Sequence, residues 1–198
     1  QSRSSAASDV YKRQLLDLAK ISAVAGHSLG EYSALVANDS LDFGSAVKLL
    51  KVRSTAMQES MPIGTGGMAA VIGKTIEEIE MILPKLREFG FISIANDNAD
   101  GQVVLSGEIK SIDHLCQNSK ELGIKRVMKL PVSAPFHCDL IMSASEQLSD
   151  VIVNYDFNEF KYNFYSNVTS NKISNTEIRE LLIQQVICRV RWREIILN

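Results

Sequence analysis

A serine between two glycines, where a short apolar run meets a helical pattern, constrains this chain more than any other feature. The stretch is "GHSLG", residues 26–30. Such a turn between a strand and a helix strains the serine backbone and presents its hydroxyl. The turn needs small neighbours, so we expect Gly26 and Gly30 to be there for steric reasons. The Leu29 N–H, at the start of the helix, is then placed to donate to an oxyanion. The pattern predicts that Ser28 is a nucleophile; the alternative is a helix cap.

A serine nucleophile needs a base, and the chain offers three histidines. The side chain of His27 should point away from Ser28, and His114 falls on a helix where a surface position is expected. His137 lies in a loop bounded by prolines, directly after a predicted strand, and is the best candidate. A triad also needs an orienting carboxylate, and no Asp stands out. We therefore predict a Ser-His dyad whose imidazole is oriented by a backbone carbonyl or an amide.

Composition narrows the class of protein. The 198 residues are 45% hydrophobic with a net charge of −2, so no basic field indicates nucleic acid or an anionic membrane. No apolar run is long enough for a membrane span. The three cysteines, Cys116, Cys138 and Cys188, lack metal-site spacing and suit a reducing cytosol. A cytoplasmic protein with no bound metal is the expectation.

The order of predicted elements divides the chain. Residues 67–130 show strands and helices in the order β-α-β-β-α-β, which is the ferredoxin-like split βαβ pattern. We predict that this segment is an insert in a catalytic core formed by residues 15–66 and 131–198. The first 14 residues, "QSRSSAASDVYKRQ", have no apolar period and are predicted to be a non-native or disordered leader. The end of the chain, "WREIILN", stops inside a helical pattern, so we expect a chain truncated at both ends.

Several motifs together carry a resemblance to a known family. They are "GHSLGEYSALVA", "VRSTAMQ", "GTGGMAAVIG", "NDNADGQVVLSG" and "KLPVSAPFHCDLIM", in this order. The chain resembles the malonyl-CoA:acyl carrier protein transacylases and the related acyltransferase domains of fatty acid and polyketide synthases. The resemblance covers about residues 15–198. It implies an α/β fold, with an α/β-hydrolase-like core containing a parallel sheet and a ferredoxin-like insert.

The resemblance also implies a reaction and its participants. A malonyl group would pass from malonyl-CoA to the phosphopantetheine thiol of acyl carrier protein through a malonyl-serine, by ping-pong chemistry and with no bound cofactor. Acyl carrier proteins are acidic, so a basic rim is expected. The candidates for that rim are Arg189, Arg191 and Arg193, or Lys125, Arg126 and Lys129.

Roles in the site follow from the matched positions. Ser28 matches the acylated nucleophile, His137 the general base and acid, and Leu29 the residue that supplies an oxyanion N–H. Gln185 matches a glutamine whose main-chain carbonyl orients the histidine. Three further matches form the substrate site. They are Arg53, which binds the malonyl carboxylate, Phe136, which crowds the substrate α-carbon and favours malonyl over methylmalonyl, and Asn98, near the cleft.

Physical chemistry supports the role of Arg53, because a planar guanidinium grips a carboxylate with two parallel hydrogen bonds. An acetyl group would leave that charge unpaired. The chain departs from the family pattern at three places. It has no match to the "GQGSQ"-type loop that would supply a second oxyanion donor, and no match to the "GPG"-type segment that follows in the family. Cys188-Arg189 stands where the family usually has a small residue or Asn followed by Pro. Three alternatives stay open: a serine esterase or thioesterase, an acyltransferase domain of a polyketide synthase, and an inactive fragment that binds carrier protein.

Overall fold

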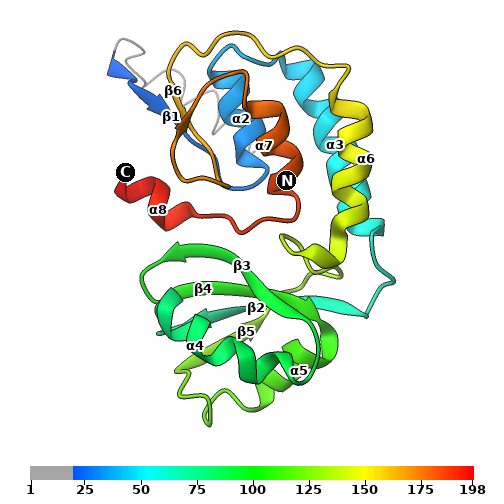
Figure 1. The fold of residues 1–198 in the computed structure, drawn as a ribbon, viewed down its shortest axis with the longest axis vertical. Helices are drawn as coiled ribbons and strands as arrows, with labels where there is room; N and C mark the ends of the chain where they lie inside the picture. The colour runs from blue at the N-terminus through cyan, green and yellow to red at the C-terminus, as the bar shows by residue number, and fades with distance from the viewer. Residues whose placement is uncertain (1–19) are drawn as a thin grey trace, which may run out of the picture.

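A computed structural model describes residues 20–198. The predicted leader, residues 1–14, lies outside the described residues. Two parts of the molecule are visible in Figure 1: helices around a small sheet in the upper part, and a four-stranded sheet with two helices below. Within residues 20–198, no helix has the length and apolar character needed to cross a membrane.

The upper part contains a short sheet and helices packed against it (Figure 1). Its strands are β1 (Ala23–Val24), β6 (Asn163–Tyr165) and β7 (Lys172–Ile173). Its helices are α2 (Gly30–Ala37), α3 (Phe43–Glu59), η2 (Asp139–Ile141), α6 (Met142–Ile152) and α7 (Ile178–Gln185). Tyr32, Leu35 and Phe164 are fully buried in the apolar core that these elements share. Asp42 begins α3 by accepting a hydrogen bond from the Ser45 N–H at 3.0 Å.

The expected parallel sheet is present only as a short mixed sheet within residues 20–198. β1 and β6 run parallel, whereas β6 and β7 run antiparallel. The reason is local: the chain turns back soon after Tyr165, and Ser170 adopts a left-handed backbone with a φ of 59°. β7 therefore returns beside β6 instead of continuing in its direction. The predicted α/β class is confirmed, but within residues 20–198 the predicted parallel sheet is seen only as the strand pair of β1 and β6.

The lower part follows the element order predicted from the sequence. Its elements are β2 (Gly66–Ile72), α4 (Ile76–Arg87), β3 (Ile92–Ala99), β4 (Gln102–Glu108), α5 (Ile109–Gln117) and β5 (Arg126–Lys129). The strands lie in the order β3-β4-β2-β5, and all neighbours are antiparallel. A capping box formed by Thr75 and Glu78 starts α4.

The four-stranded sheet is apolar on both faces, as a sheet covered on both sides should be. Leu105 and Val103 belong to the core that α4 and α5 cover. Val104, between them in sequence, faces the other side with Met68, because side chains alternate along a strand. Phe136 packs against this second cluster and also against the core of the upper part. The two parts therefore share apolar contacts next to the loop that carries His137.

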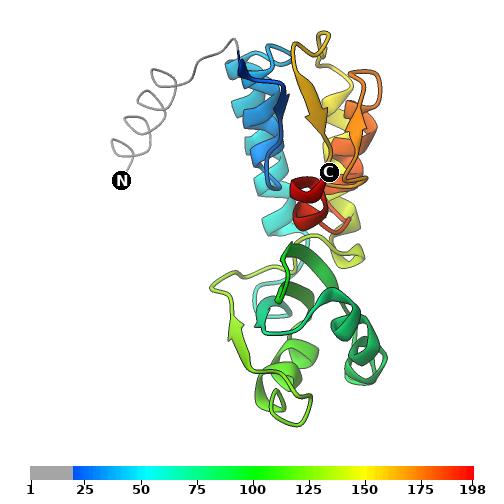
Figure 2. The same cartoon turned by 90° about the vertical axis from the view of Figure 1, so that its left-hand side faces the viewer.

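The C-terminal segment joins the two parts, and helix α8 (Trp192–Leu197) lies between them in both views (Figure 1 and Figure 2). The Val190 N–H donates to the Ala95 carbonyl at 2.8 Å, and the Asp97 N–H donates to the Val190 carbonyl at 2.9 Å. Arg193 also grips the buried Asp97, with Nε 3.0 and 3.1 Å from its two carboxylate oxygens. This segment ties β3 to the upper part.

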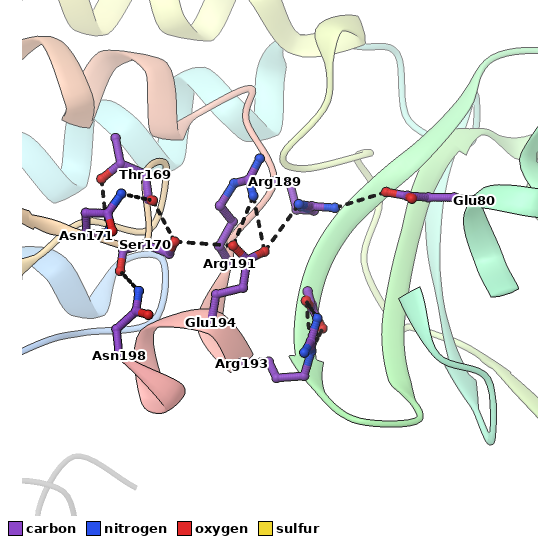
Figure 3. Close-up of polar contacts among 10 residues, drawn as sticks. Glu80, Thr169, Ser170, Asn171, Arg189, Arg191, Arg193, Glu194 and Asn198 are labelled. Carbon is purple, nitrogen blue, oxygen red and sulfur yellow. Dashed lines mark hydrogen bonds and ion pairs between the residues drawn. The ribbon is translucent and has the colours of Figure 1, made fainter. Parts of the chain in front are cut away.

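The same segment pairs its arginines internally, as Figure 3 shows. Arg189 lies between Glu80, at 3.5 Å, and Glu194, at 3.3 Å. Arg191 contacts Glu194 at 3.1 Å. The cluster of three arginines that the sequence offered as a basic rim is thus largely neutralised within the chain.

Candidate active site

The turn from β1 into α2 places Ser28 in a conformation that L-residues rarely adopt. Its φ is 53°, in the left-handed region. Gly26 is sterically required, because a Cβ there would collide with the Gly30 carbonyl and the Glu31 nitrogen. The same expectation is wrong for Gly30, where a Cβ would meet nothing within 4 Å. The backbone of Gly30 fills the space that a side chain at residue 26 would need, so the glycine is required at residue 26 and not at residue 30.

Ser28 and His137 are brought together across 109 residues of sequence. Ser28 Oγ lies 2.8 Å from His137 Nε2, and His137 Nδ1 lies 2.8 Å from the Gln185 main-chain carbonyl. Because a carbonyl oxygen can only accept, the ring proton belongs on Nδ1. Nε2 is then free to accept the proton of the Ser28 hydroxyl. The hydrogen bond to the main chain of Gln185 has the geometry expected for orientation of the ring.

Burial keeps His137 neutral. The side chain is 5% exposed, and burial lowers the pKa of His137 to about 3. The positive charge of Arg53 acts in the same direction, whereas the hydrogen bond to Gln185 opposes it. An imidazole with this pKa is unprotonated at neutral pH, as a general base must be before it takes a proton.

Arg53 reaches the same oxygen atom from α3. Its Nη2 donates to Ser28 Oγ at 2.9 Å and to the Gln185 side-chain oxygen, also at 2.9 Å. The side chain is buried, and burial lowers the pKa of the guanidinium, although Tyr32 and Glu31 oppose the shift. Arg53 Nε is buried without a hydrogen-bond partner among residues 20–198. A buried cation with a spare donor therefore lies beside the hydroxyl, and such a group suits an anionic ligand.

The buried carboxyl of Glu31 binds two residues that contact Ser28, and it was not among the site residues predicted from the sequence. Glu31 is fully buried and accepts hydrogen bonds from the Asn167 N–H, at 2.6 Å, and from the Gln185 side-chain amide. Burial raises the pKa of Glu31 to about 8, and these hydrogen bonds and Arg53 act against the rise. Its signal was present: Glu31 is the one charged residue of the apolar helix "GEYSALVA".

Asn167 was also missed, and nothing in the local sequence marks it. It lies after β6 and is fully buried. Its side-chain oxygen accepts from the Ser28 N–H at 2.6 Å, and its amide nitrogen donates to the Gly26 carbonyl at 2.7 Å. The Ser28 carbonyl is in turn bonded by the Gln185 amide at 3.0 Å. The backbone of the turn is therefore held by side chains from two distant segments.

The other residues considered for the site, Asn98, Phe136, Leu29 and His114, differ in their surroundings. Asn98 is bonded to His27, with 2.8 Å between the amide oxygen and Nε2, and not to Ser28 or Arg53. Phe136 directly precedes His137 and is half-buried. The Leu29 side chain is 56% exposed, and no hydrogen bond recorded among residues 20–198 uses its N–H. That N–H is available to a bound oxygen. His114 stacks on Phe89, in the lower part.

Residues 20–198 contain no cluster of three or more His, Cys, Asp or Glu side chains arranged to hold a metal ion. The chemistry that this arrangement offers is nucleophilic: a hydroxyl bonded to a neutral imidazole, beside a buried guanidinium.

Comparisons with known proteins identify the family of the chain. The family model described as "Acyl transferase domain" matches residues 19–189. Malonyl CoA-acyl carrier protein transacylase of Haemophilus influenzae is 40% identical over 186 residues, covering 93% of this chain and 59% of that protein. The crystal structure of acyl-carrier-protein-S-malonyltransferase from Bartonella henselae is 39% identical, with a TM-score of 0.88, covering 95% of this chain and 60% of that one.

A third match includes a partner. A malonyl-transacylase in complex with a type II polyketide acyl-carrier protein is 37% identical, with a TM-score of 0.82, covering 86% of this chain and 56% of that one. The chain thus spans less than two thirds of the length of each of these relatives.

Proposed function

The chain belongs to the acyl transferase domain family, and from that premise we propose that it transfers a malonyl group from malonyl-CoA to the phosphopantetheine thiol of acyl carrier protein. The observation that carries the proposal is the double contact on Ser28 Oγ. A neutral base, His137, lies 2.8 Å away, and a buried cation, Arg53, lies 2.9 Å away. A hydrolase of neutral esters has no use for that cation.

The reaction proceeds in two halves. His137 Nε2 takes the Ser28 proton as Oγ attacks the thioester carbonyl, and the oxyanion is held by the Leu29 N–H. The C–S bond breaks, and the CoA thiolate takes the proton from His137. The carrier thiol then gives its proton to His137 and attacks the carbonyl of malonyl-Ser28. The ester C–O bond breaks, and Ser28 Oγ takes the proton back from His137. The carbonyl of Gln185 holds the imidazole in one tautomer throughout and stabilises its protonated form.

Selectivity for malonyl rests on Arg53. The malonyl carboxylate pairs with the guanidinium through the unpartnered Nε and a neighbouring nitrogen, in the fork geometry that suits a carboxylate. Phe136 limits the space at the substrate α-carbon and disfavours a methyl branch. Asn98 contributes to the substrate site through its contact with His27.

The finer architecture is part of the same proposal. Residues 15–66 and 131–198 form an α/β-hydrolase-like core, and residues 67–130 form a ferredoxin-like insert. The antiparallel order β3-β4-β2-β5 supports the second assignment, and the turn at Ser28 between β1 and α2 supports the first. The three cysteines are free thiols, in keeping with a reducing cytoplasm.

The acidic carrier protein docks on the exposed basic residues at the start of β5. Lys125 and Arg126 are exposed, and no ion pair is recorded for either among residues 20–198. Lys129 is paired with Asp113 at 2.6 Å. Lys125→Glu with Arg126→Glu should raise the KM for carrier protein severalfold and leave the KM for malonyl-CoA unchanged, whereas the matched pair Lys48→Glu with Lys51→Glu on α3 should change neither. An unchanged KM for carrier protein in the first variant excludes this surface.

One experiment separates transfer from hydrolysis. The intact protein is mixed with malonyl-CoA and holo acyl carrier protein, and malonyl-carrier and free malonate are quantified. A transacylase gives malonyl-carrier in excess, and acetyl-CoA gives little product. An esterase or thioesterase gives the free acid with or without carrier, and an inactive carrier-binding protein gives neither. Either of these last two results overturns the proposal.

A further inference from the structure

Asn167 uses both ends of its side-chain amide on the backbone that surrounds the nucleophile. Oδ1 accepts from the Ser28 N–H at 2.6 Å, and Nδ2 donates to the Gly26 carbonyl at 2.7 Å. These two backbone groups lie on either side of His27. The amide therefore bridges the turn at the point where Ser28 takes a positive φ.

The position of Asn167 is itself fixed from two directions. Its N–H donates to Glu31 Oε1 on α2 at 2.6 Å, and its carbonyl accepts from the Arg191 N–H at 3.0 Å. The residue is fully buried, so water does not compete for these groups. Because backbone and side chain are both held, the amide has one orientation.

We infer that Asn167 is a positioning residue, which holds the Ser28 backbone in its left-handed conformation so that Oγ meets both His137 and Arg53. The inference rests on the proposed role of Ser28 as the nucleophile. A left-handed serine is unfavourable by itself, and surrounding structure must maintain it. Without the amide, the Ser28 N–H and the Gly26 carbonyl lose their buried partner, and the turn relaxes toward ordinary backbone angles.

The bridge needs a donor and an acceptor on one short side chain. An asparagine has both, whereas an ionised aspartate has acceptors only and would face the Gly26 carbonyl with a second negative oxygen. A protonated aspartic acid regains the donor. Asn167→Asp should therefore convert the bridge into one that forms at low pH and fails at high pH.

Neighbouring groups push the new carboxyl toward its protonated form. The titratable and charged groups of the surrounding elements are Glu31 on α2, Arg53 on α3, His27 in the turn, His137 in its loop and Arg191 before α8. Burial raises the pKa of an aspartate at this position, and Arg53 lowers it. Because the pKa of Glu31 is about 8, its charge adds to the rise only near the upper end of the pH range. His137, with its pKa of about 3, remains a base over the pH range of the test.

The test is the rate of Ser28 acylation by malonyl-CoA in the intact protein, followed by mass spectrometry from about pH 5 to about pH 8.5. Asn167→Asp should lose about tenfold to a hundredfold at the upper limit and recover most of the rate at the lower limit. Asn171→Asp is the matched control: Asn171 is exposed, and the hydrogen bond recorded for its side chain within residues 20–198 is to the Thr169 carbonyl, so its profile should follow the unmodified protein. A profile of Asn167→Asp parallel to the unmodified one overturns the inference.

A second variant covers the case in which the aspartate disturbs folding. Asn167→Ala should lower the acylation rate about tenfold or more while the KM for malonyl-CoA changes less than about twofold, because Arg53 keeps its contact with Gln185 and stays available to the malonyl carboxylate. Thermal melting identifies folded samples. A folded Asn167→Ala protein with an unmodified rate, or with a loss only in KM, contradicts the positioning role.

A failure of the proposed function can be distinguished from a failure of the inference about Asn167. If malonyl-CoA does not acylate Ser28 in the unmodified protein, that function is wrong. The same variants are then compared with a fluorophosphonate probe, which reacts with activated serines of any specificity. Slower labelling of Asn167→Ala than of Asn171→Asp supports the inference, and equal labelling overturns it.

Discussion

Removal of the Arg53 guanidinium should change the choice between acyl groups more than it changes catalysis itself. Arg53→Met keeps much of the buried stem and removes every donor. Nη2 now bonds Ser28 and Gln185, so its loss slows acylation by any thioester. That common effect cancels in the ratio of kcat/KM for malonyl-CoA to kcat/KM for acetyl-CoA. The ratio isolates the contact with the malonyl carboxylate.

The size of the change follows from that contact. Two charge-assisted hydrogen bonds to a carboxylate, at about 1.5–2 kcal/mol each, give about 3–4 kcal/mol in the transition state. At about 1.4 kcal/mol per factor of ten, the malonyl-to-acetyl ratio should fall roughly 10²–10³-fold. Acetyl transfer should lose less, because the acetyl group never pairs with the buried charge.

The assay is single-turnover acylation by each thioester, with Arg179→Met as the matched control. Arg179 is also a partly buried arginine with an unpartnered Nε, but its Nη2 donates to the Tyr155 carbonyl, and no hydrogen bond recorded within residues 20–198 joins it to Ser28. Its loss should leave the ratio unchanged. If folded Arg53→Met protein keeps the unmodified ratio, the carboxylate clamp is refuted.

Two further predictions concern pH and the turn. Because the pKa of His137 is lowered to about 3, acylation should stay level as the pH falls from about 8 to about 5, and a decline centred near 6.5 would contradict a buried neutral base. The same shift makes the fold lose stability as the pH drops below about 6.5 toward 3, since the unfolded chain binds a proton that the folded chain excludes; His137→Gln should flatten that slope in urea titrations. Gly26→Ala should lower the free energy of unfolding by about 3 kcal/mol or more, whereas Gly30→Ala should change it by less than about 1 kcal/mol. Equal effects of the two alanines would refute the steric account of the turn.

The features that the sequence predicted best are those set by short, local residue patterns. The turn at Ser28 could be predicted from five residues, although only Gly26, and not Gly30, is sterically required there. The order of strands and helices in the lower part could be read from alternating apolar patterns. The contacts of His137 with Ser28 and with the Gln185 carbonyl agree with expectations that came from the family resemblance. Their catalytic roles remain predictions.

The parts that could not be predicted depend on contacts between distant segments. Asn167 meets Ser28 across 139 residues, and no periodicity marks an asparagine in a polar loop. Glu31 stands out as the charged residue of an apolar helix, but the sequence does not indicate that it contacts Gln185. The mixed sheet depends on a left-handed Ser170, which the residue type does not require. The partner of Asn98, His27, is likewise a product of tertiary packing.

The central claim is that Ser28 carries the acyl group, and intact-protein mass spectrometry tests it most directly. The protein is incubated briefly with malonyl-CoA or acetyl-CoA, beside a Ser28→Ala variant. A single malonyl adduct on the unmodified protein, weak acetyl labelling, and no adduct on the variant are the expected result. Equal malonyl labelling of Ser28→Ala, or no adduct on folded unmodified protein, would contradict the account.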